Sequence, residues 1–562
     1  MTCLDWIYLC EEGGNTESQR LNPIDKVEKT FREGKGIEME NRFKQSLLDP
    51  NTLSVTWELV PGRGAREKAQ ESALLAAEQA AKGGKIHALT ITDNPGGNPA
   101  ILADYLGQEI LKLGIEPLVH FTCKDKNRNQ MESQLYALDR AEVRSLLVMT
   151  GDYTVSGFKG RPKPVFDLDP THTLELIAQM NEGLGIPGPK GMSYHQPSDF
   201  FAGAAVSPFK GTEAEQMVQY YKLKKKVTSG AQFIVTQLGY DARKIHEVLQ
   251  FMKLNDLNVP LVGNIYILPF GAAKIMNQNQ LPGCVVTDKL LAEIDKERTA
   301  EDKGVSARLL RAAKMYALMK GMGFAGVHIG GHNIKYEQVE YVIEKGEELS
   351  KDWLALVPEF DYPMPNGFYY YEKDSKTGLN TTTPVNRKNL PLDAPVGVAY
   401  SGMRLMHSML FTPGKNFFPV MRKIYKGRKD NRKHGLEHLA KVITNDCKDC
   451  GDCAMFELAY LCPMSQCPKN QRNGACGGSY QGWCEVYPNQ KQCIYVRAYA
   501  RLKKYDEEGD LDSHHIPPAN WDLYQTSSWS NFFLGRDHSG KILGIPTPEE
   551  EAAKVKGAEP AK

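Results

Sequence analysis

Long apolar runs and an excess of charge of one sign are both missing from this 562-residue sequence. No stretch stays apolar over the roughly 20 residues that a helix needs to cross a bilayer. The formal net charge is only +1, which argues against a nucleic-acid-binding protein, because such proteins normally carry a basic excess. The N-terminal segment MTCLDWIYLC has no basic lead and no small-residue cleavage site, so it is not typical of a signal peptide. We therefore predict a cytoplasmic protein without a membrane span and without a nucleic-acid partner.

Cysteine is scarce over most of the chain. Only four of the 12 cysteines lie outside residues 447–493, and we interpret these four as ordinary thiols without partner spacing: Cys3, Cys10, Cys123 and Cys284. The other eight crowd into a segment that contains no histidine: Cys447, Cys450, Cys453, Cys462, Cys467, Cys476, Cys484 and Cys493. In a cytosolic protein such crowding indicates metal more often than disulfides.

The spacing of these eight cysteines favours an iron–sulfur site. Cys447, Cys450 and Cys453 form a C-x2-C-x2-C run, which brings three thiolates onto one tight loop, as in iron–sulfur proteins. Zinc sites more often use two separated C-x2-C pairs, often with histidine. Eight thiolates suit two sites of four cysteines each. We predict iron–sulfur clusters, of the [4Fe–4S] type, with zinc as the alternative and disulfides as the least favoured interpretation.

Short β-rich runs alternate with amphipathic stretches from residue 53 onward. The runs at 53–60, 86–92, 117–121, 145–149, 200–206, 232–237, 259–267 and 325–329 are eight strand candidates. Eight strand–helix units of this kind predict an α/β fold of the (β/α)8 TIM-barrel type. A doubly wound open sheet is the rival, but no G-x-G-x-x-G opens the first helix.

Five of the eight predicted strands end in polar or turn-forming residues. These are Glu58, Thr92, His120, the Gly151-Asp152 pair and Gln237. In a TIM barrel the C-terminal ends of the strands carry the active site. Glu58 lies on an apolar strand end, where desolvation favours the protonated carboxyl, so it is a candidate general acid near neutral pH.

The composition divides the chain into five regions. We predict an N-terminal extension (1–45), the barrel (46–345), a connecting region rich in Tyr and Pro (346–439), a cysteine-rich metal-binding domain (440–505) and a C-terminal tail (506–562).

Six segments of the barrel, in this order, resemble methylenetetrahydrofolate reductase: WELVPGRG, LTITDNPGG, PLVHFTCKDKNRNQMESQLYAL, LLVMTGDY, KKVTSGAQFIVTQLGYD and VPLVGNIYIL. The resemblance covers roughly residues 50–335. It implies a TIM barrel that holds a flavin, usually FAD, at its C-terminal face. It also implies the interconversion of 5,10-methylenetetrahydrofolate and 5-methyltetrahydrofolate in one-carbon metabolism.

The resemblance implies a role for each matching residue. Glu58 corresponds to the general acid that gives the folate N10 its proton. Asp152 corresponds to the aspartate near flavin and folate, where its charge can stabilise a cationic folate. Gln237 corresponds to a pterin-contacting glutamine. The implied flavin contacts are Thr92, His120, Thr150, Gly151 and Lys226.

Three departures from the family pattern fall on the flavin and reductant side. Thr150 stands where better-known members have Arg. GAAVSP, with Gly203 and Ser207, replaces a Tyr-Pro-Glu-x-His segment, and HIGGHN replaces a pattern that closes with Arg. The departures leave open whether the cofactor is FAD or FMN, and whether NAD(P)H is the direct donor.

The cysteine-rich segment is similar to a C-terminal domain associated with this reductase in some bacteria. The similarity depends on the segments CPMSQCPK, RNGACGG and GWCEV and on the closing Cys493-Ile-Tyr. The similarity implies an electron path to the flavin from a ferredoxin-like donor or a partner subunit, and a homo-oligomer is expected. Two alternatives stay open: a folate-linked methyltransferase with a structural zinc, and an electron-transfer subunit with an inactive barrel.

Overall fold

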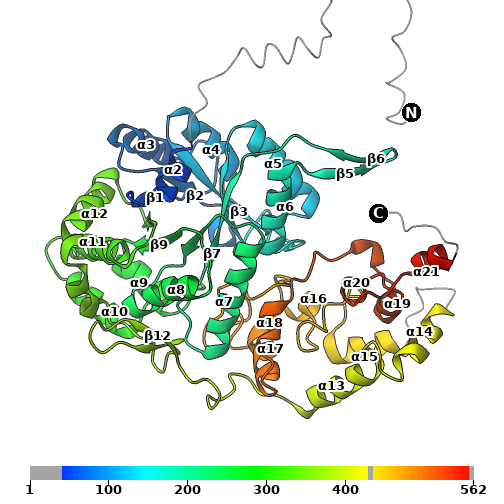
Figure 1. Ribbon diagram of the computed structural model, residues 1–562. Coiled ribbons are helices and arrows are strands. Elements are labelled where there is room, and N and C mark those ends of the chain that lie inside the picture. The colour runs from blue at the N-terminus through cyan, green and yellow to red at the C-terminus, as the bar shows by residue number, and fades with distance from the viewer. Residues whose placement is uncertain (1–40, 428–434, 556–562) are drawn as a thin grey trace, which may run out of the picture. The chain divides into compact units, whose positions relative to one another are not determined.

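Eight parallel strands close into a barrel in the computed structural model, which describes residues 41–427 and 435–555 (Figure 1). The order around the barrel is β1-β10-β9-β8-β7-β4-β3-β2. The strands are β1 (Ser54–Leu59), β2 (Ala88–Ile91), β3 (Glu116–Thr122), β4 (Ser145–Met149), β7 (Phe201–Val206), β8 (Phe233–Thr236), β9 (Leu261–Tyr266) and β10 (Gly326–Gly330). Each overlaps one of the eight predicted runs, and the prediction of a closed barrel over an open sheet is confirmed.

Amphipathic helices follow the strands and cover the outside of the barrel (Figure 1). They are α3 (Lys68–Gly83), α4 (Ala103–Lys112), α5 (Arg128–Arg140), α6 (Pro170–Glu182), α7 (Glu213–Thr228), α8 (Ala242–Leu254), α9 (Phe270–Asn277), α10 (Asp288–Glu297), α11 (Val305–Met322) and α12 (Tyr336–Leu349). Several begin at an N-cap whose side chain accepts a backbone N–H, as Asn127 does for α5 and Asp169 for α6. The hairpin of β5 (Gly185–Gly188) and β6 (Gly191–Tyr194) extends between α6 and β7.

The helix α2 (Arg42–Leu48) closes the N-terminal end of the barrel. Its Phe43 is fully buried and packs edge-on against Phe201 and Phe233, the first residues of β7 and β8. This end is therefore filled with apolar side chains, which leaves the C-terminal strand ends for a site. The predicted extension 1–45 lies mostly outside the described residues, as do Cys3 and Cys10.

The C-terminal part contains little regular structure around its cysteines. After the segment η2 (Ser350–Phe360) come the strands β11 (Tyr371–Lys373) and β12 (Asn380–Pro384). The helices are α13 (Val398–Leu410), α14 (Phe418–Lys426), α15 (Gly435–Asn445), α16 (Pro463–Gln466), α17 (Ile494–Lys503), α18 (Asp510–Ser513), α19 (Ser528–Phe533), α20 (His538–Ile542) and α21 (Pro548–Val555). The described residues from Arg42 onward form one compact unit. No helix among them is long and apolar enough to span a membrane.

Candidate active site and cysteine sites

Glu58 lies at the end of β1 beside a histidine that the sequence patterns did not single out. His328, on the neighbouring strand β10, has its Nε2 atom 3.7 Å from a carboxylate oxygen of Glu58. A hydrogen bond of 2.9 Å between the other ring nitrogen and Thr56 Oγ1 fixes the imidazole. Gly330 follows on β10, and a Cβ there would lie 3.3 Å from Glu58 Oε1. The HIGG segment therefore provides both a partner and space for the Glu58 carboxylate.

The expected net rise in the pKa of Glu58 is not found. Burial does favour the protonated carboxyl, but the His328 imidazole, whose Nε2 lies 3.7 Å from the carboxylate, outweighs this effect. The pKa of Glu58 consequently lies below its ordinary value of 4.5. A general acid at this position needs a further influence, such as the exclusion of water by a bound substrate, to hold its proton near neutral pH.

His120 points an unsatisfied polar atom into the barrel. Its ring is buried, and its Nε2 has no hydrogen-bond partner among the described residues. Burial lowers the pKa of His120 to about 4, so the ring is neutral. A buried polar atom without a partner is costly, and a polar group of a bound cofactor would satisfy it. Thr92, after β2, is also buried, and its backbone N–H donates to the carbonyl of Leu59 at 3.2 Å.

Asp152 joins the loops that follow β2 and β4. Its carboxylate accepts the backbone N–H of Gly96 at 2.7 Å, and it is itself exposed. Gly151 adopts a φ of +82°, and a Cβ there would lie 2.9 Å from Lys124 and from Thr122. Glycine is thus required at this turn both for its backbone conformation and for space. The turn presents a carboxylate next to the strand ends that carry Glu58 and His120.

Gln237 lies at the end of β8, close to the cysteine-rich region. Its Oε1 accepts the backbone N–H of Leu238 at 2.8 Å. A Cβ on Gly283 would lie 3.6 Å from Gln237 Nε2 and 3.2 Å from the carbonyl oxygen of Gly477. The segment that contains Gly477 therefore approaches the mouth of the barrel beside the predicted pterin contact.

Two of the positions that depart from the family pattern face the cysteine-rich region. Thr150 is buried, and its hydroxyl donates to Gln471 Oε1 at 3.1 Å. Ser207 is buried as well, and a Cβ on Gly477 would lie 3.5 Å from its Cβ. Lys210, just beyond it, donates to the carbonyls of Gly477 and Ser479. The region between the ends of β4 and β7 is thus covered by a second part of the chain.

Lys226 lies on the last turn of α7, and its ammonium group donates to the carbonyl of Ala205 on β7. Burial lowers its pKa to about 7, with the nearby charge of Lys222 acting in the same direction. The structure therefore places Lys226 against the barrel wall between β7 and the cysteine-rich region.

The eight clustered cysteines line two separate cavities. Cys447, Cys450, Cys453 and Cys462 line the first, which we name the first cysteine set. Cys467, Cys476, Cys484 and Cys493 line the second cavity, the second cysteine set. All eight are free thiols, and no three His, Cys, Asp or Glu side chains of the described residues converge closely enough to hold a single metal ion.

The two barrel cysteines lie apart from these sets. Cys123 is buried, and its Sγ lies 3.3 Å from the hydroxyl of Thr173. Cys284 lies near the barrel mouth, where burial and the charges of Asp152 and Glu58 raise its pKa to about 12. The methyltransferase alternative requires thiolates that converge at the mouth, and of these two sulfurs only Cys284 lies near it.

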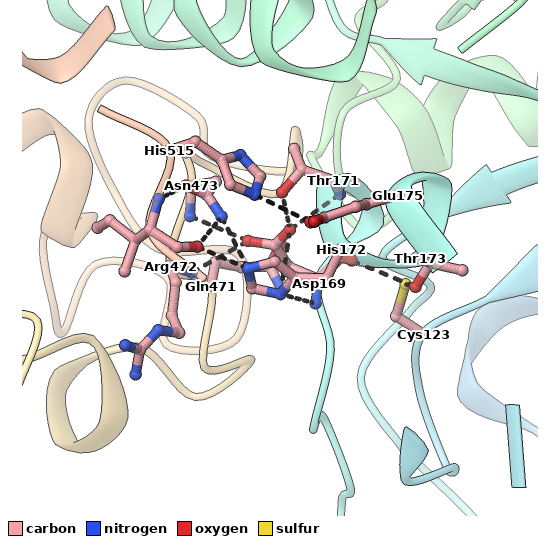
Figure 2. A network of polar contacts seen from close by, with 12 residues as sticks. Cys123, Asp169, Thr171, His172, Thr173, Glu175, Gln471, Arg472, Asn473 and His515 are labelled. Carbon is pink, nitrogen blue, oxygen red and sulfur yellow. Dashed lines mark hydrogen bonds and ion pairs between the residues drawn. The ribbon is translucent and has the colours of Figure 1, made fainter. Parts of the chain in front are cut away.

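A buried carboxylate holds the cysteine-rich region on the barrel (Figure 2). Asp169 caps α6, and one of its oxygens accepts the backbone N–H groups of Arg472 and Asn473 at 3.2 and 2.9 Å. Its other oxygen accepts the backbone N–H and the hydroxyl of Thr171 at 2.9 and 2.6 Å. His172 adds a 2.7 Å hydrogen bond to the carbonyl of Ile516. The segment between Cys467 and Cys476 is therefore fixed against the N-terminal end of α6.

The sequence patterns gave no signal for His328, Asp169 or Lys469. Lys469 donates to the carbonyl of Gly151 at 2.7 Å across 318 residues of sequence. His328 lies in the HIGGHN segment, which the sequence presents only as a departure from the family pattern.

Comparisons with known proteins identify two families along the chain. The family described as "Methylenetetrahydrofolate reductase" matches residues 42–343, more than half of the chain. A second family, "Methylene-tetrahydrofolate reductase C terminal", matches residues 427–522. No curated protein matches the chain.

Two solved structures show weak similarity. One is an uncharacterized protein from Clostridium thermocellum that "binds two copies of 5-methyl-5,6,7,8-tetrahydrofolic acid", at 13% identity and a TM-score of 0.39, covering 55% of this chain and 98% of that one. The other is EDTA monooxygenase (EmoA) from Chelativorans sp. BNC1, at 11% identity and a TM-score of 0.33, covering 53% of this chain and 93% of that one.

Proposed function

The chain belongs to the methylenetetrahydrofolate reductase family, and from this premise we propose that it interconverts 5,10-methylenetetrahydrofolate and 5-methyltetrahydrofolate at the C-terminal face of its barrel. One observation carries the proposal. Three candidate residues lie at strand ends on one side of the barrel. Glu58 is on β1, His120 is on β3 and Asp152 follows β4, and these strands belong to the continuous series β1-β2-β3-β4. They are the residues that the chemistry requires, since it needs a proton donor, a cofactor contact and a negative charge.

The chain's own residues act on the folate. Reduction requires the five-membered ring of the substrate to open to a cationic iminium, and opening requires a proton on N10. Glu58 holds that proton, and binding of the folate removes the water that now screens part of its carboxyl, whose side chain is 23% exposed. Asp152 stabilises the cation by its charge. Gln237 orients the pterin from the end of β8.

A flavin supplies the hydride, delivered from its N5, when it is bound. The residues that would hold it are Thr92, His120, Thr150, Gly151 and Lys226. The unpartnered Nε2 of His120 supports the fit, because a polar group of the cofactor would satisfy it. Thr150 also contacts the cysteine-rich region, because its hydroxyl donates to Gln471 Oε1.

The two cysteine sets support an electron-transfer role for the C-terminal region. Each cavity is lined by four thiols, a donor set that suits one [4Fe–4S] cluster. The second set belongs to the segment that Asp169 and Lys469 hold against the barrel mouth. We expect electrons to pass from the first set to the second and on to the flavin. Zinc is the alternative metal.

We propose the same division of the chain as the sequence predicts: barrel 46–345, connecting region 346–439, cysteine-rich domain 440–505 and tail 506–562. We also propose a cytoplasmic homo-oligomer that receives electrons from NAD(P)H, a ferredoxin-like protein or a partner subunit. Free thiols in the described part of the chain support a reducing compartment.

Anaerobic purification followed by flavin, iron and zinc analysis and a visible spectrum tests the proposal. We expect one flavin per chain, broad iron–sulfur absorbance, and oxidation of 5-methyltetrahydrofolate with an artificial acceptor. Zinc without iron would refute the electron relay alone. Protein that binds flavin but does not turn over folate would refute the proposed reaction.

A further inference from the structure

Lys469 is a buried cation that has been assigned neither to the barrel's candidate active site nor to the metal-binding cysteines. It lies in the cysteine-rich region, two residues after Cys467, and its side chain is only 4% exposed. Its ammonium group donates to the carbonyl of Gly151, at 2.7 Å, and forms an ion pair with Glu485. A buried ammonium group is unfavourable unless it is paired and hydrogen-bonded, and both conditions are met here.

Glu485 connects this cation to the second cysteine set. The carboxylate follows Cys484 directly, its side chain is 7% exposed, and its Oε2 lies 3.3 Å from Cys476 Sγ. A continuous line of contacts therefore runs from the Gly151 carbonyl through Lys469 and Glu485 to Cys476. No other ion pair among the described residues joins the Gly151–Asp152 turn to a cysteine of either set.

The electrostatic surroundings keep Lys469 charged. The ion pair with Glu485 and the hydrogen bond to the Gly151 carbonyl both favour the charged ammonium group. Lys124 also packs against this turn, and its ammonium donates to the carbonyl of Asn94. A permanent positive charge thus lies between the turn and the second cysteine set.

We propose that Lys469 is a positioning residue through which the cysteine-rich region completes the barrel's active site. It fixes the Gly151–Asp152 turn and places a positive charge between the flavin site and the second cysteine set. The inference rests on the proposed function, because it assigns the turn to flavin and folate contact. A positive charge stabilises an electron added nearby, so Lys469 raises the midpoint potential of the bound flavin.

Redox titration of the bound flavin in the full-length, anaerobically purified protein tests the inference by the sign of the shift. We expect Lys469→Gln to shift the flavin midpoint potential to more negative values. Glu485→Gln leaves the cation unneutralised and should shift the potential to more positive values. Lys469→Arg should restore the wild-type potential, since it keeps the charge.

Lys222→Gln is the matched control. Lys222 is an equally buried lysine at the same boundary, where it donates to Gln471 Oε1 and to the carbonyl of Gly474 at 2.7 and 3.0 Å, without a contact to Gly151. Its removal should leave the flavin potential closer to wild type than Lys469→Gln does. The double variant Lys469→Gln/Glu485→Gln covers the case in which an unpaired buried Glu485 prevents folding, and its potential should again be more negative than wild type.

Shifts of the same sign in the Lys469 and Glu485 single variants, or an equal shift in Lys222→Gln, would overturn the inference, because both patterns indicate loosened docking only. Suppose that the wild-type protein binds flavin and oxidises 5-methyltetrahydrofolate, and that the flavin in Lys469→Gln has the wild-type midpoint potential. This result would overturn the inference and leave the proposed function intact. Wild-type protein that binds no flavin would overturn both.

Discussion

Replacing His328 should raise the pKa of Glu58 and extend folate reduction to higher pH. In His328→Leu the nearby imidazole that lowers this pKa is lost, and the effect of burial remains. Coulomb's law gives about 4 kcal/mol for unit charges about 4 Å apart at an effective dielectric constant of about 20. The Nε2–carboxylate distance is 3.7 Å, but the Glu58 side chain is 23% exposed, so solvent screens part of this energy. We expect a shift of about 1–2 pH units, at about 1.4 kcal/mol per unit.

The sign follows from the role of Glu58. The general acid must be protonated, so the rate of folate reduction falls as the pH rises through its pKa. A higher pKa moves that fall to higher pH. Stopped-flow oxidation of the reduced flavin by 5,10-methylenetetrahydrofolate, measured from acid to alkaline pH, reports the shift.

His328→Gln is the control for this shift, because it keeps a hydrogen-bond donor near Glu58 without the charge and should shift the profile less. A profile that moves to lower pH in His328→Leu, or does not move at all, would show that His328 does not control the Glu58 proton.

Four further substitutions test the remaining parts of the account. Glu58→Gln should abolish folate reduction and spare flavin reduction by an artificial donor; near-normal folate turnover would end its assignment as the acid. Asp152→Asn should slow the folate half-reaction by about 1–4 kcal/mol in barrier, and an unchanged rate with flavin bound would remove it from the mechanism. Cys450→Ala should remove part of the iron–sulfur absorbance and lower the activity driven by the electron donor. It should leave the oxidation of 5-methyltetrahydrofolate by an artificial acceptor unchanged. Loss of stability without a change in the visible spectrum would instead favour structural zinc. Asp169→Asn should weaken docking of the cysteine-rich region by about 1–3 kcal/mol, seen as faster proteolysis between the barrel and that region, and wild-type resistance would contradict the docking role.

The pH dependence of docking has a defined direction. Burial would raise the pKa of Asp169, but His172, Lys222 and the hydrogen bonds to the carboxylate lower it well below its ordinary value of 3.8. A carboxyl group whose folded-state pKa is depressed stabilises the fold above the ordinary value and loses that contribution as the pH falls towards the folded-state value. Docking should therefore be independent of pH near neutrality and weaken only in acid.

Local patterns predicted the barrel because each strand is specified by its own residues. The run SLLVM is fully apolar after its first residue and coincides with β4 (Ser145–Met149) residue for residue. Strand ends also follow from local sequence, so the strand pattern alone predicts that Glu58, His120 and Asp152 lie at one face of the barrel.

Long-range contacts could not be predicted in the same way. The pKa of Glu58 depends on His328, which is 270 residues away in the sequence and becomes a neighbour only when β1 pairs with β10. Thr150 and Ser207 looked like losses at a flavin site, but in the fold they face Gln471 and Gly477. Such contacts depend on how the C-terminal region docks, and no periodicity in either segment encodes that arrangement.

Reduction of the bound flavin by 5-methyltetrahydrofolate in a single anaerobic turnover tests the central claim most directly. The measurement needs neither the cysteine sets nor a physiological donor, since the folate itself provides the electrons. We predict that the visible absorbance of the oxidised flavin bleaches in the wild-type protein and does not bleach in Glu58→Gln. A fully flavin-loaded wild-type protein whose flavin stays oxidised with excess 5-methyltetrahydrofolate would contradict the account.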